Sequence, residues 1–216
     1  MPTVFVTGGT GFMGRTLIME LVRRGYTVKA LVRQGSEQKL PHGSTAVHGD
    51  ALDKNSFVSQ IPPAETFVQL VGVTHPNPAK KEEFRAVDLG SARAAIEAAR
   101  EAGVTHFVYV SVAQPAPVMK FYVAVRAEVE QMIRQSALNA TILRPWYVLG
   151  PGRRWPLFLK PIYWLMEQIP ATRESAQRLG LVTIEQMAGA LVWSVENPAQ
   201  GVRILRVREI REKRGA

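Results

Sequence analysis

The sequence predicts an α/β fold with a doubly wound parallel sheet and a small C-terminal cap. Apolar runs of strand length alternate with helical patterns along most of the chain, which is typical of repeated strand–helix units around a parallel sheet. Three glycines, Gly8, Gly11 and Gly14, lie where the first apolar run gives way to the first helical pattern. The length of 216 residues suits one well-buried core, so we expect a single domain over residues 1–216.

The predicted elements follow one another in a regular order. Apolar runs indicate strands at residues 2–7, 27–33, 45–49, 66–72, 104–110, 140–144 and 202–208. Helical patterns indicate helices at residues 12–24, 53–60, 80–102, 120–136 and 183–196. Gly25 and Gly103 are placed to end two of these helices, because glycine readily takes the left-handed conformation found at helix C-termini.

Residues 151–180 interrupt this order, with four prolines among many aromatic residues, and we expect the cap here. Within it, residues 153–170 mix basic side chains with apolar and aromatic ones. Such a segment could cover a hydrophobic substrate, form a partner interface or make peripheral contact with a membrane. We expect it to be core or pocket wall, and a pocket wall of this kind implies a substrate with a large apolar part.

The composition limits the classes of site that the chain can contain. The absence of cysteine excludes disulfides, thiol nucleophiles and thiolate metal sites. The histidines lack the paired spacing of metal ligands, so we expect no metal site; they are His42, His48, His75 and His106. We see no signal peptide and no transmembrane segment, and we expect a cytoplasmic protein.

The net charge of +9 raises the question of a nucleic-acid or membrane partner. The basic residues are scattered, and the densest cluster, "REIREKRGA" at residues 208–216, contains its own acids. We interpret that cluster as a solvated tail and favour a small-molecule partner over nucleic acid. The sequence leaves the oligomeric state open.

The glycine-rich segment "TGGTGFMG" at residues 7–14 has the spacing of a dinucleotide-binding loop. Such a loop needs one glycine for a tight turn, one for close approach to the pyrophosphate and one for packing of helix on strand. The helix that follows points its free N–H groups at the anion. We therefore expect a Rossmann fold whose cofactor contacts include Gly8, Thr10, Gly11, Phe12, Met13 and Gly14.

Two arginines favour NADP(H) over NAD(H). A fold specific for NAD carries an acidic residue about 20 positions after the loop, whereas this chain has "KALVRQ" with Arg33 at the strand end. Arg33 and Arg15 could bind a ribose 2′-phosphate through charge-assisted hydrogen bonds. The alternative is that each arginine is a solvated end of a strand or helix.

The motifs "TGGTGFMG", "HGDALD", "VQLVG", "HFVYVSV" and "ILRPWYVLGPG" occur in this order, and the chain resembles an atypical or extended short-chain dehydrogenase/reductase. More closely, it resembles the NAD(P)-binding, epimerase/dehydratase-like and NmrA-like branch. The resemblance implies that Asp50 contacts the adenine and that Pro145, in "RP", leads toward the nicotinamide. It also implies that the nucleotide is lined by Leu70, Val71 and Gly72.

The same resemblance implies a catalytic set. The family uses a serine after the fifth strand and a tyrosine four residues before a lysine; here these positions hold Ser111, Tyr122 and Arg126. A spacing of four places Tyr122 and Arg126 on one helix face, where Arg126 would bind the nicotinamide ribose and favour the phenolate. A guanidinium does not relay a proton, because its pKa is above 12. The alternative is an ordinary aromatic and surface-charge pair.

Asp88 stands in "FRAVDLGSA", where many extended members carry asparagine. A buried carboxylate would need partners, so we expect Asp88 on the helix surface. Taken together, these features predict an NADP(H)-dependent oxidoreductase of a small, partly apolar carbonyl substrate. The alternative function is a non-catalytic NADP(H)-binding sensor or accessory protein of the NmrA-like kind.

Overall fold

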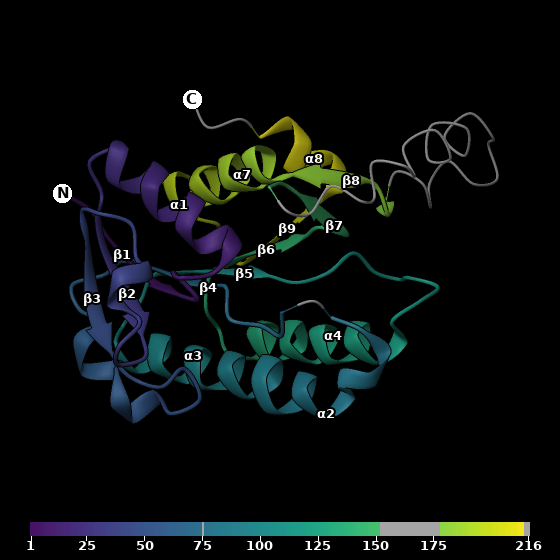
Figure 1. The fold of residues 1–216 in the computed structure, drawn as a ribbon, viewed down its shortest axis with the longest axis horizontal. Helices are drawn as coiled ribbons and strands as arrows, with labels where there is room; N and C mark the ends of the chain where they lie inside the picture. Colours follow the sequence, from purple (N-terminus) through teal and green to yellow (C-terminus); the bar gives the residue numbers. More distant parts are fainter. Residues whose placement is uncertain (75, 152–177, 214–216) are drawn as a thin grey trace.

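The computed structural model describes residues 1–74, 76–151 and 178–213. Most of the cap predicted over residues 151–180 lies outside the described residues. The whole segment 153–170 lies outside them as well. In the described part, helices cover both faces of a central sheet (Figure 1).

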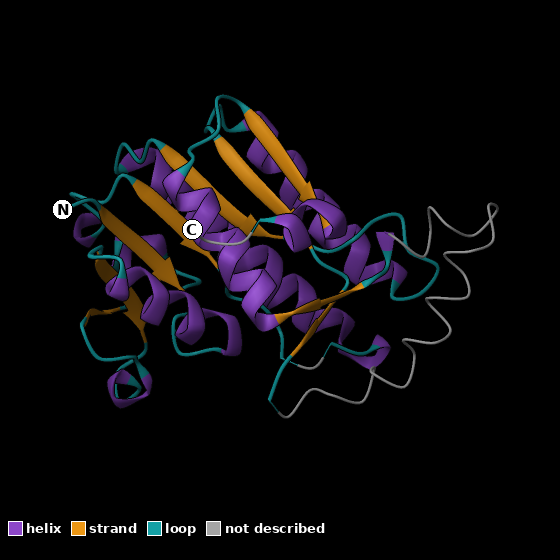
Figure 2. Ribbon diagram, turned by 90° about the horizontal axis from the view of Figure 1, so that it is seen from above, coloured by secondary structure: helices purple, strands orange, loops and turns teal. Residues whose placement is uncertain are grey.

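The central sheet has seven parallel strands in the order β3-β2-β1-β4-β5-β6-β9. Their bounds are β1 Thr3–Thr7, β2 Thr27–Val32, β3 Ser44–His48, β4 Thr66–Gln69, β5 His106–Val110, β6 Ala140–Arg144 and β9 Val202–Arg206. Figure 2 shows these strands side by side. The predicted α/β fold with a doubly wound parallel sheet is confirmed, and every strand predicted from the apolar runs is present.

The strand order reverses between β1 and β4. The chain runs outward from β1 to β3 and then returns to place β4 on the other side of β1. In open parallel sheets, ligands bind at such a reversal, beyond the carboxyl ends of the strands. Every residue of β1, β4 and β5 is buried, as expected for central strands covered on both faces.

Two layers of helices bury the two faces (Figure 1). One layer contains α1 Phe12–Arg23, α7 Ile184–Glu196 and α8 Val207–Glu212. The other contains α2 Lys81–Glu83, α3 Gly90–Glu101 and α4 Lys120–Gln135. The core under α3 and α4 includes stacked or tilted rings from β1, β4 and β5, contributed by Phe5, Phe67 and Phe107.

Some elements differ from the prediction. The helix expected at residues 53–60 is a pair of 3₁₀ turns, η2 Lys54–Ser56 and η3 Val58–Gln60. The helix expected at 80–102 is divided into the 3₁₀ turn η4 Pro78–Lys80, then α2, then the π-helix η5 Phe84–Leu89, then α3. A further 3₁₀ turn, η1 Glu37–Lys39, follows β2.

A second, two-stranded parallel sheet joins β7 Tyr147–Leu149 to β8 Leu181–Thr183. The sequence did not predict it, because each strand is only three residues long and its partner lies more than 30 positions away. The sheet lies at the carboxyl-end side of β6, so it places residues 147 and 148 near the cofactor cleft described below.

The prediction of a solvated tail at residues 208–216 is wrong for its first part. Residues 207–212 form α8, whose Val207 and Ile210 are buried in the core between the sheet and α7. Arg211 also donates two hydrogen bonds to the carbonyl of Leu181, at 2.9 and 3.0 Å. The spacing of three between Val207 and Ile210 puts both on one helix face, and that face packs inward. Within the described residues, no helix is both long enough and apolar enough to span a bilayer.

Candidate active site

The glycine loop is shaped for the close approach of a phosphate. Gly8 has φ +73°, and a Cβ there would lie 2.8 Å from the carbonyl carbon of Leu70. A Cβ at Gly14 would lie 2.2 Å from the carbonyl oxygen of Gly8. Only glycine fits these two positions, because a side chain would collide with backbone. The amide of Gly11 closes the turn by donating to the Gly8 carbonyl at 3.0 Å.

Helix α1 starts directly after this turn, with Gly11 as its N-cap. Within the described residues no side chain caps the helix start, and its first turn contains no acidic residue. The first N–H groups and the positive end of the helix dipole are thus directed to a bound anion. The loop therefore fits the pyrophosphate of a dinucleotide.

The loop forms one wall of a cleft of about 220 Å³ at the carboxyl ends of β1, β4 and β5. The predicted site residues that line this cleft are Gly8, Gly11, Phe12, Met13, Gly14, Leu70, Gly72, Ser111, Tyr122, Arg126 and Pro145. Five other predicted contacts are not among its lining residues: Thr10, Arg15, Arg33, Asp50 and Val71. The fold thus brings the predicted catalytic residues together with the glycine loop.

The two arginines predicted to bind a 2′-phosphate are both exposed. Arg33 follows directly after β2, and Arg15 lies in the first turn of α1. Neither forms an ion pair with a described residue. Asp50 is exposed as well, and its carboxylate accepts a hydrogen bond from the amide of Leu52 at 3.0 Å.

Tyr122 and Arg126 meet on α4, as their spacing predicts. The guanidinium carbon of Arg126 lies 5.1 Å from the centre of the Tyr122 ring, so the cation sits over the aromatic face. The tyrosine ring also contacts Phe84, with the ring centres 4.9 Å apart. The half-buried Tyr122 thus contacts both a cation and an aromatic ring.

Arg126 is buried and hydrogen-bonded to three groups. Its Nη1 donates to the Tyr109 hydroxyl at 3.1 Å and to the Val110 carbonyl at 2.8 Å, and its Nη2 donates to Asp88. Burial opposes the charge, but the neighbouring Tyr109, Tyr122 and Asp88 raise the pKa of Arg126 above its ordinary value. Arg126 is therefore a fixed cation. Its buried Nε has no hydrogen-bond partner among the described residues.

The prediction that Asp88 lies on the helix surface is wrong. Its side chain is fully buried, pairs with Arg126 and accepts a hydrogen bond from the Val73 amide at 3.0 Å. Burial raises the pKa of the Asp88 carboxyl, and the charge of Arg126 and the Val73 hydrogen bond oppose that increase. The carboxylate has the partners that a buried charge requires, and it receives them from a strand end and from α4, both distant in sequence.

Glu130 is a site residue that the sequence analysis missed. It is buried on α4 and accepts hydrogen bonds from Ser111 at 2.7 Å, Gln114 at 2.7 Å and Arg144 at 2.9 and 2.5 Å. Burial alone would raise its pKa, but the hydrogen bonds from Arg144 and Ser111 and the nearby arginine charges lower the pKa of the Glu130 carboxyl. Its spacing in the sequence could have indicated it, because Glu130 lies four residues after Arg126 and eight after Tyr122.

The Glu130 carboxylate determines the orientation of the Ser111 hydroxyl. An ionised carboxylate only accepts hydrogen bonds, so the hydroxyl proton of Ser111 points at Glu130. The lone pairs of the same oxygen stay available to accept a hydrogen bond from a bound group. Ser111 in this arrangement is an acceptor that Glu130 positions.

Residues 8–153 match the model of the NAD(P)H-binding family. The chain belongs to this family. The Rossmann-type fold and the NAD(P)H-binding family that the resemblance implied are confirmed. The glycine loop and the cleft of this NAD(P)H-binding protein both lie inside the matched residues.

Curated relatives of this NAD(P)H-binding chain include two reductases. It is 29% identical over 201 residues to a ceramide reductase of Caulobacter vibrioides, covering 92% of this chain and 62% of that protein. It is 28% identical over 229 residues to a 3-diazoavenalumate denitrifying reductase of a Streptomyces species, covering 92% of this chain and 73% of that protein. The chain thus spans less than two thirds of the length of the first relative.

Solved structures share the fold of this NAD(P)H-binding protein. The Bordetella bronchiseptica enzyme WbmH in complex with NAD⁺ aligns with a TM-score of 0.71 and 19% identity, covering 98% of this chain and 79% of that one. This likeness establishes the fold.

Proposed function

We propose that this chain is an NADP(H)-dependent oxidoreductase that reduces a carbonyl group on a small, partly apolar substrate. The observation that carries the proposal is that Tyr122 lines the same cleft as the glycine loop. A hydroxyl proton donor and a dinucleotide site in one cleft are the two parts that carbonyl reduction requires. The names of the two reductase relatives support the reaction class.

In this proposal, a reduced nicotinamide would, when bound, supply the hydride that the carbonyl carbon needs. Tyr122 donates its hydroxyl proton to the carbonyl oxygen, so the product is an alcohol and the tyrosine becomes a phenolate. Arg126 stabilises that phenolate, since a nearby positive charge lowers a tyrosine pKa. Because Arg126 keeps its own proton, the proton that restores Tyr122 comes from solvent.

Ser111 and Arg126 also help to position the substrate and the cofactor in this proposal. Once Tyr122 has regained its proton from solvent, Ser111 accepts a hydrogen bond from the product alcohol, since its own proton is directed to Glu130. Arg126, which lines the cleft, binds the nicotinamide ribose in this proposal. Preference for NADP(H) rests on the exposed Arg33 and Arg15, which are free of ion pairs to the described residues and follow β2 and the glycine loop.

The proposal is tested with a panel of ketones and aldehydes, following NADPH oxidation by the wild-type chain and by Tyr122→Phe. General acid catalysis typically contributes about 10²- to 10⁴-fold in rate, so we expect kcat to fall by about that factor while the Kd for NADPH is retained. Turnover that is equal in the two proteins contradicts the role of Tyr122.

The NADP(H)-binding sensor is the second candidate function, and the observation in its favour is Arg126 at the position of the family's lysine. A sensor function predicts that the chain binds NADPH but does not oxidise it with any ketone or aldehyde of the panel. The same experiment therefore separates the two functions.

A further inference from the structure

A second cavity shares Tyr122 with the cofactor cleft. It measures about 470 Å³, within the usual range of about 300 to 1,000 Å³ for small-molecule sites. We call it the Phe84 pocket, and its lining residues are Pro78, Lys81, Phe84, Met119, Lys120, Phe121 and Tyr122. Among the described residues, Tyr122 alone lines both this pocket and the cofactor cleft. A ligand that fills the pocket therefore ends at the proposed proton donor.

Two segments far apart in the sequence build the pocket. One is the run η4, α2 and the start of η5, and the other is the N-terminal end of α4. The contact between Phe84 and Tyr122, with ring centres 4.9 Å apart, joins the two. Phe84 is 1% exposed, so this wall is anchored in the core.

Met119 lines the pocket in an unusual backbone conformation. It precedes α4 in the left-handed conformation, with φ 55°, which is unfavourable for a residue other than glycine. Residues held in such conformations cluster at ligand sites and active sites. The adjoining π-helix η5 is also a feature found frequently at functional sites.

The wall of the pocket is apolar and its edge is cationic. Phe84, Met119 and Phe121 present aromatic and thioether groups, whereas Lys81 and Lys120 are exposed. Neither lysine forms an ion pair with a described residue, although Glu82 directly follows Lys81 in the sequence. The next acid, Glu83, pairs with Lys80 at 3.6 Å. Two lysines that are not neutralised by those acids favour an anionic group at the edge of an apolar site.

We propose that the Phe84 pocket binds an apolar chain that ends in an anionic group, with Lys81 and Lys120 binding the anion. The substrate class is then an amphiphilic carbonyl compound, whose carbonyl lies at Tyr122 and whose chain extends away from the cofactor cleft. The assignment to a substrate rests on the proposed function, whereas binding of such a chain in the pocket does not.

The test uses dodecanoate as the probe and the full chain, with binding measured by calorimetry below the micellar concentration. We expect dodecanoate to bind and dodecyltrimethylammonium, with the same chain and the opposite charge, to bind at least about tenfold more weakly. Replacing both lysines, Lys81→Gln with Lys120→Gln, removes the anion contacts and weakens dodecanoate binding by about five- to tenfold. Acetate, which lacks the chain, is expected not to bind.

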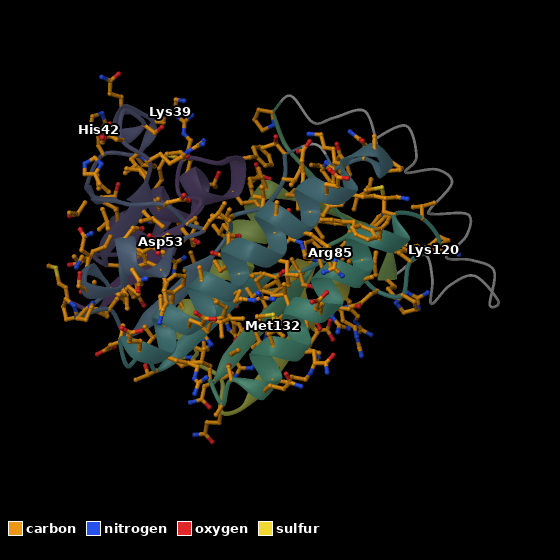
Figure 3. The ribbon with its side chains drawn as sticks, turned by 90° about the horizontal axis from the view of Figure 1, so that it is seen from below. Lys39, His42, Asp53, Arg85, Lys120 and Met132 are labelled. Carbon is orange, nitrogen blue, oxygen red and sulfur yellow. The ribbon has the colours of Figure 1, made fainter. Side chains whose placement is uncertain are left out.

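The control is Lys39→Gln, which removes one positive charge from another part of the surface. Figure 3 shows Lys39 and Lys120 at opposite ends of the molecule, and the control is expected to bind dodecanoate like the wild type. Met119→Trp fills the pocket and is expected to abolish dodecanoate binding, with NADPH binding in the same sample as the check that this variant is folded.

Two outcomes overturn the inference. Absence of dodecanoate binding to the wild type removes the pocket as a site for an apolar chain. The same weakening per removed charge in Lys39→Gln and in the double lysine variant shows that net charge, and not the pocket edge, attracts the anion. Failure of the proposed function is a separate result, since it appears as no NADPH oxidation while dodecanoate binding still depends on Lys81 and Lys120.

Discussion

At the scale of single residues, Arg126 explains why position 72 is a glycine and position 88 an aspartate. Its guanidinium reaches Tyr109, the Val110 carbonyl and Asp88 at once, which suits a planar group with five donors better than an ammonium. A Cβ at Gly72 would lie 2.5 Å from Nη2 of Arg126 and 3.1 Å from Asp88. Gly72 thus leaves the space that the ion pair occupies, and Asp88 supplies the charge that balances it.

The first prediction concerns this buried ion pair. Arg126→Met leaves the Asp88 carboxylate buried without its partner, and we expect the free energy of unfolding to fall by about 3–5 kcal/mol. Adding Asp88→Asn removes the unpaired charge, so the double variant is expected to be more stable than Arg126→Met. Urea denaturation measures both values. A double variant that is no more stable than Arg126→Met would show that the loss comes from packing.

At the scale of elements, η5 and α4 each place two site residues four positions apart, and the two pairs contact each other. Phe84 and Asp88 on η5 face Tyr122 and Arg126 on α4, respectively. Both contacts come from packing the π-helical stretch of the segment against α4. The helical pattern over 80–102 predicted a helix correctly but not its π-helical turn, because periodicity does not distinguish a local i→i+5 stretch.

Strand β5 supplies a prediction about pH. His106 is fully buried, with Nε2 3.0 Å from the Thr141 hydroxyl on β6. Burial, with a smaller effect from the charge of Arg203, lowers the pKa of His106 to about 4. The unfolded chain takes up this proton near pH 6.5, so the stabilising contribution is complete above that pH and declines as the pH falls toward 4.

We expect the loss of this contribution to lower the free energy of unfolding by about 2 kcal/mol between pH 7.5 and pH 5. The measurement is the free energy of unfolding in urea at both pH values for the wild type and for His106→Gln. The glutamine retains a hydrogen-bonding group but does not titrate, so the variant should lose less stability over this interval. An identical loss in both proteins would assign the pH dependence to other groups.

The reversal of strand order between β1 and β4, at the scale of the whole molecule, creates the cofactor cleft. The glycine loop follows β1, Leu70 and Gly72 follow β4, and Ser111 follows β5. Tyr122 and Arg126 reach the same cleft from α4 on one side of the sheet, and Phe12 and Met13 from α1 on the other. A cofactor bound there joins both layers, so binding is expected to stabilise the whole described fold.

The last prediction uses this coupling to measure cofactor preference. A ligand present at 100 times its Kd stabilises a protein by about 2.7 kcal/mol, so NADPH should raise Tm more than an equal concentration of NADH. Arg33→Ala removes charge-assisted hydrogen bonds to a 2′-phosphate and should weaken NADPH binding about tenfold or more, with little effect on NADH. Arg208→Ala, an exposed arginine on α8, is the control. An unchanged difference between NADPH and NADH in Arg33→Ala would contradict the role of Arg33.

The sequence by itself determined the features that depend on neighbouring residues. The strands of the large sheet follow from short apolar runs, and the glycine loop follows from local backbone conformation at Gly8 and close packing at Gly14. The meeting of Tyr122 with Arg126 follows from their spacing on one helix. Each of these depends on a few consecutive residues, so pattern and spacing were sufficient.

Only the tertiary structure decided which polar groups share the interior. Asp88 is 38 positions from Arg126, and Ser111 is 19 from Glu130, so neither pair has a signature in the local pattern. The Phe84 pocket and the docking of α8 likewise arise where separate segments pack together. A buried charge is stable only when a partner reaches it, and the fold of the whole chain determines whether that partner is there.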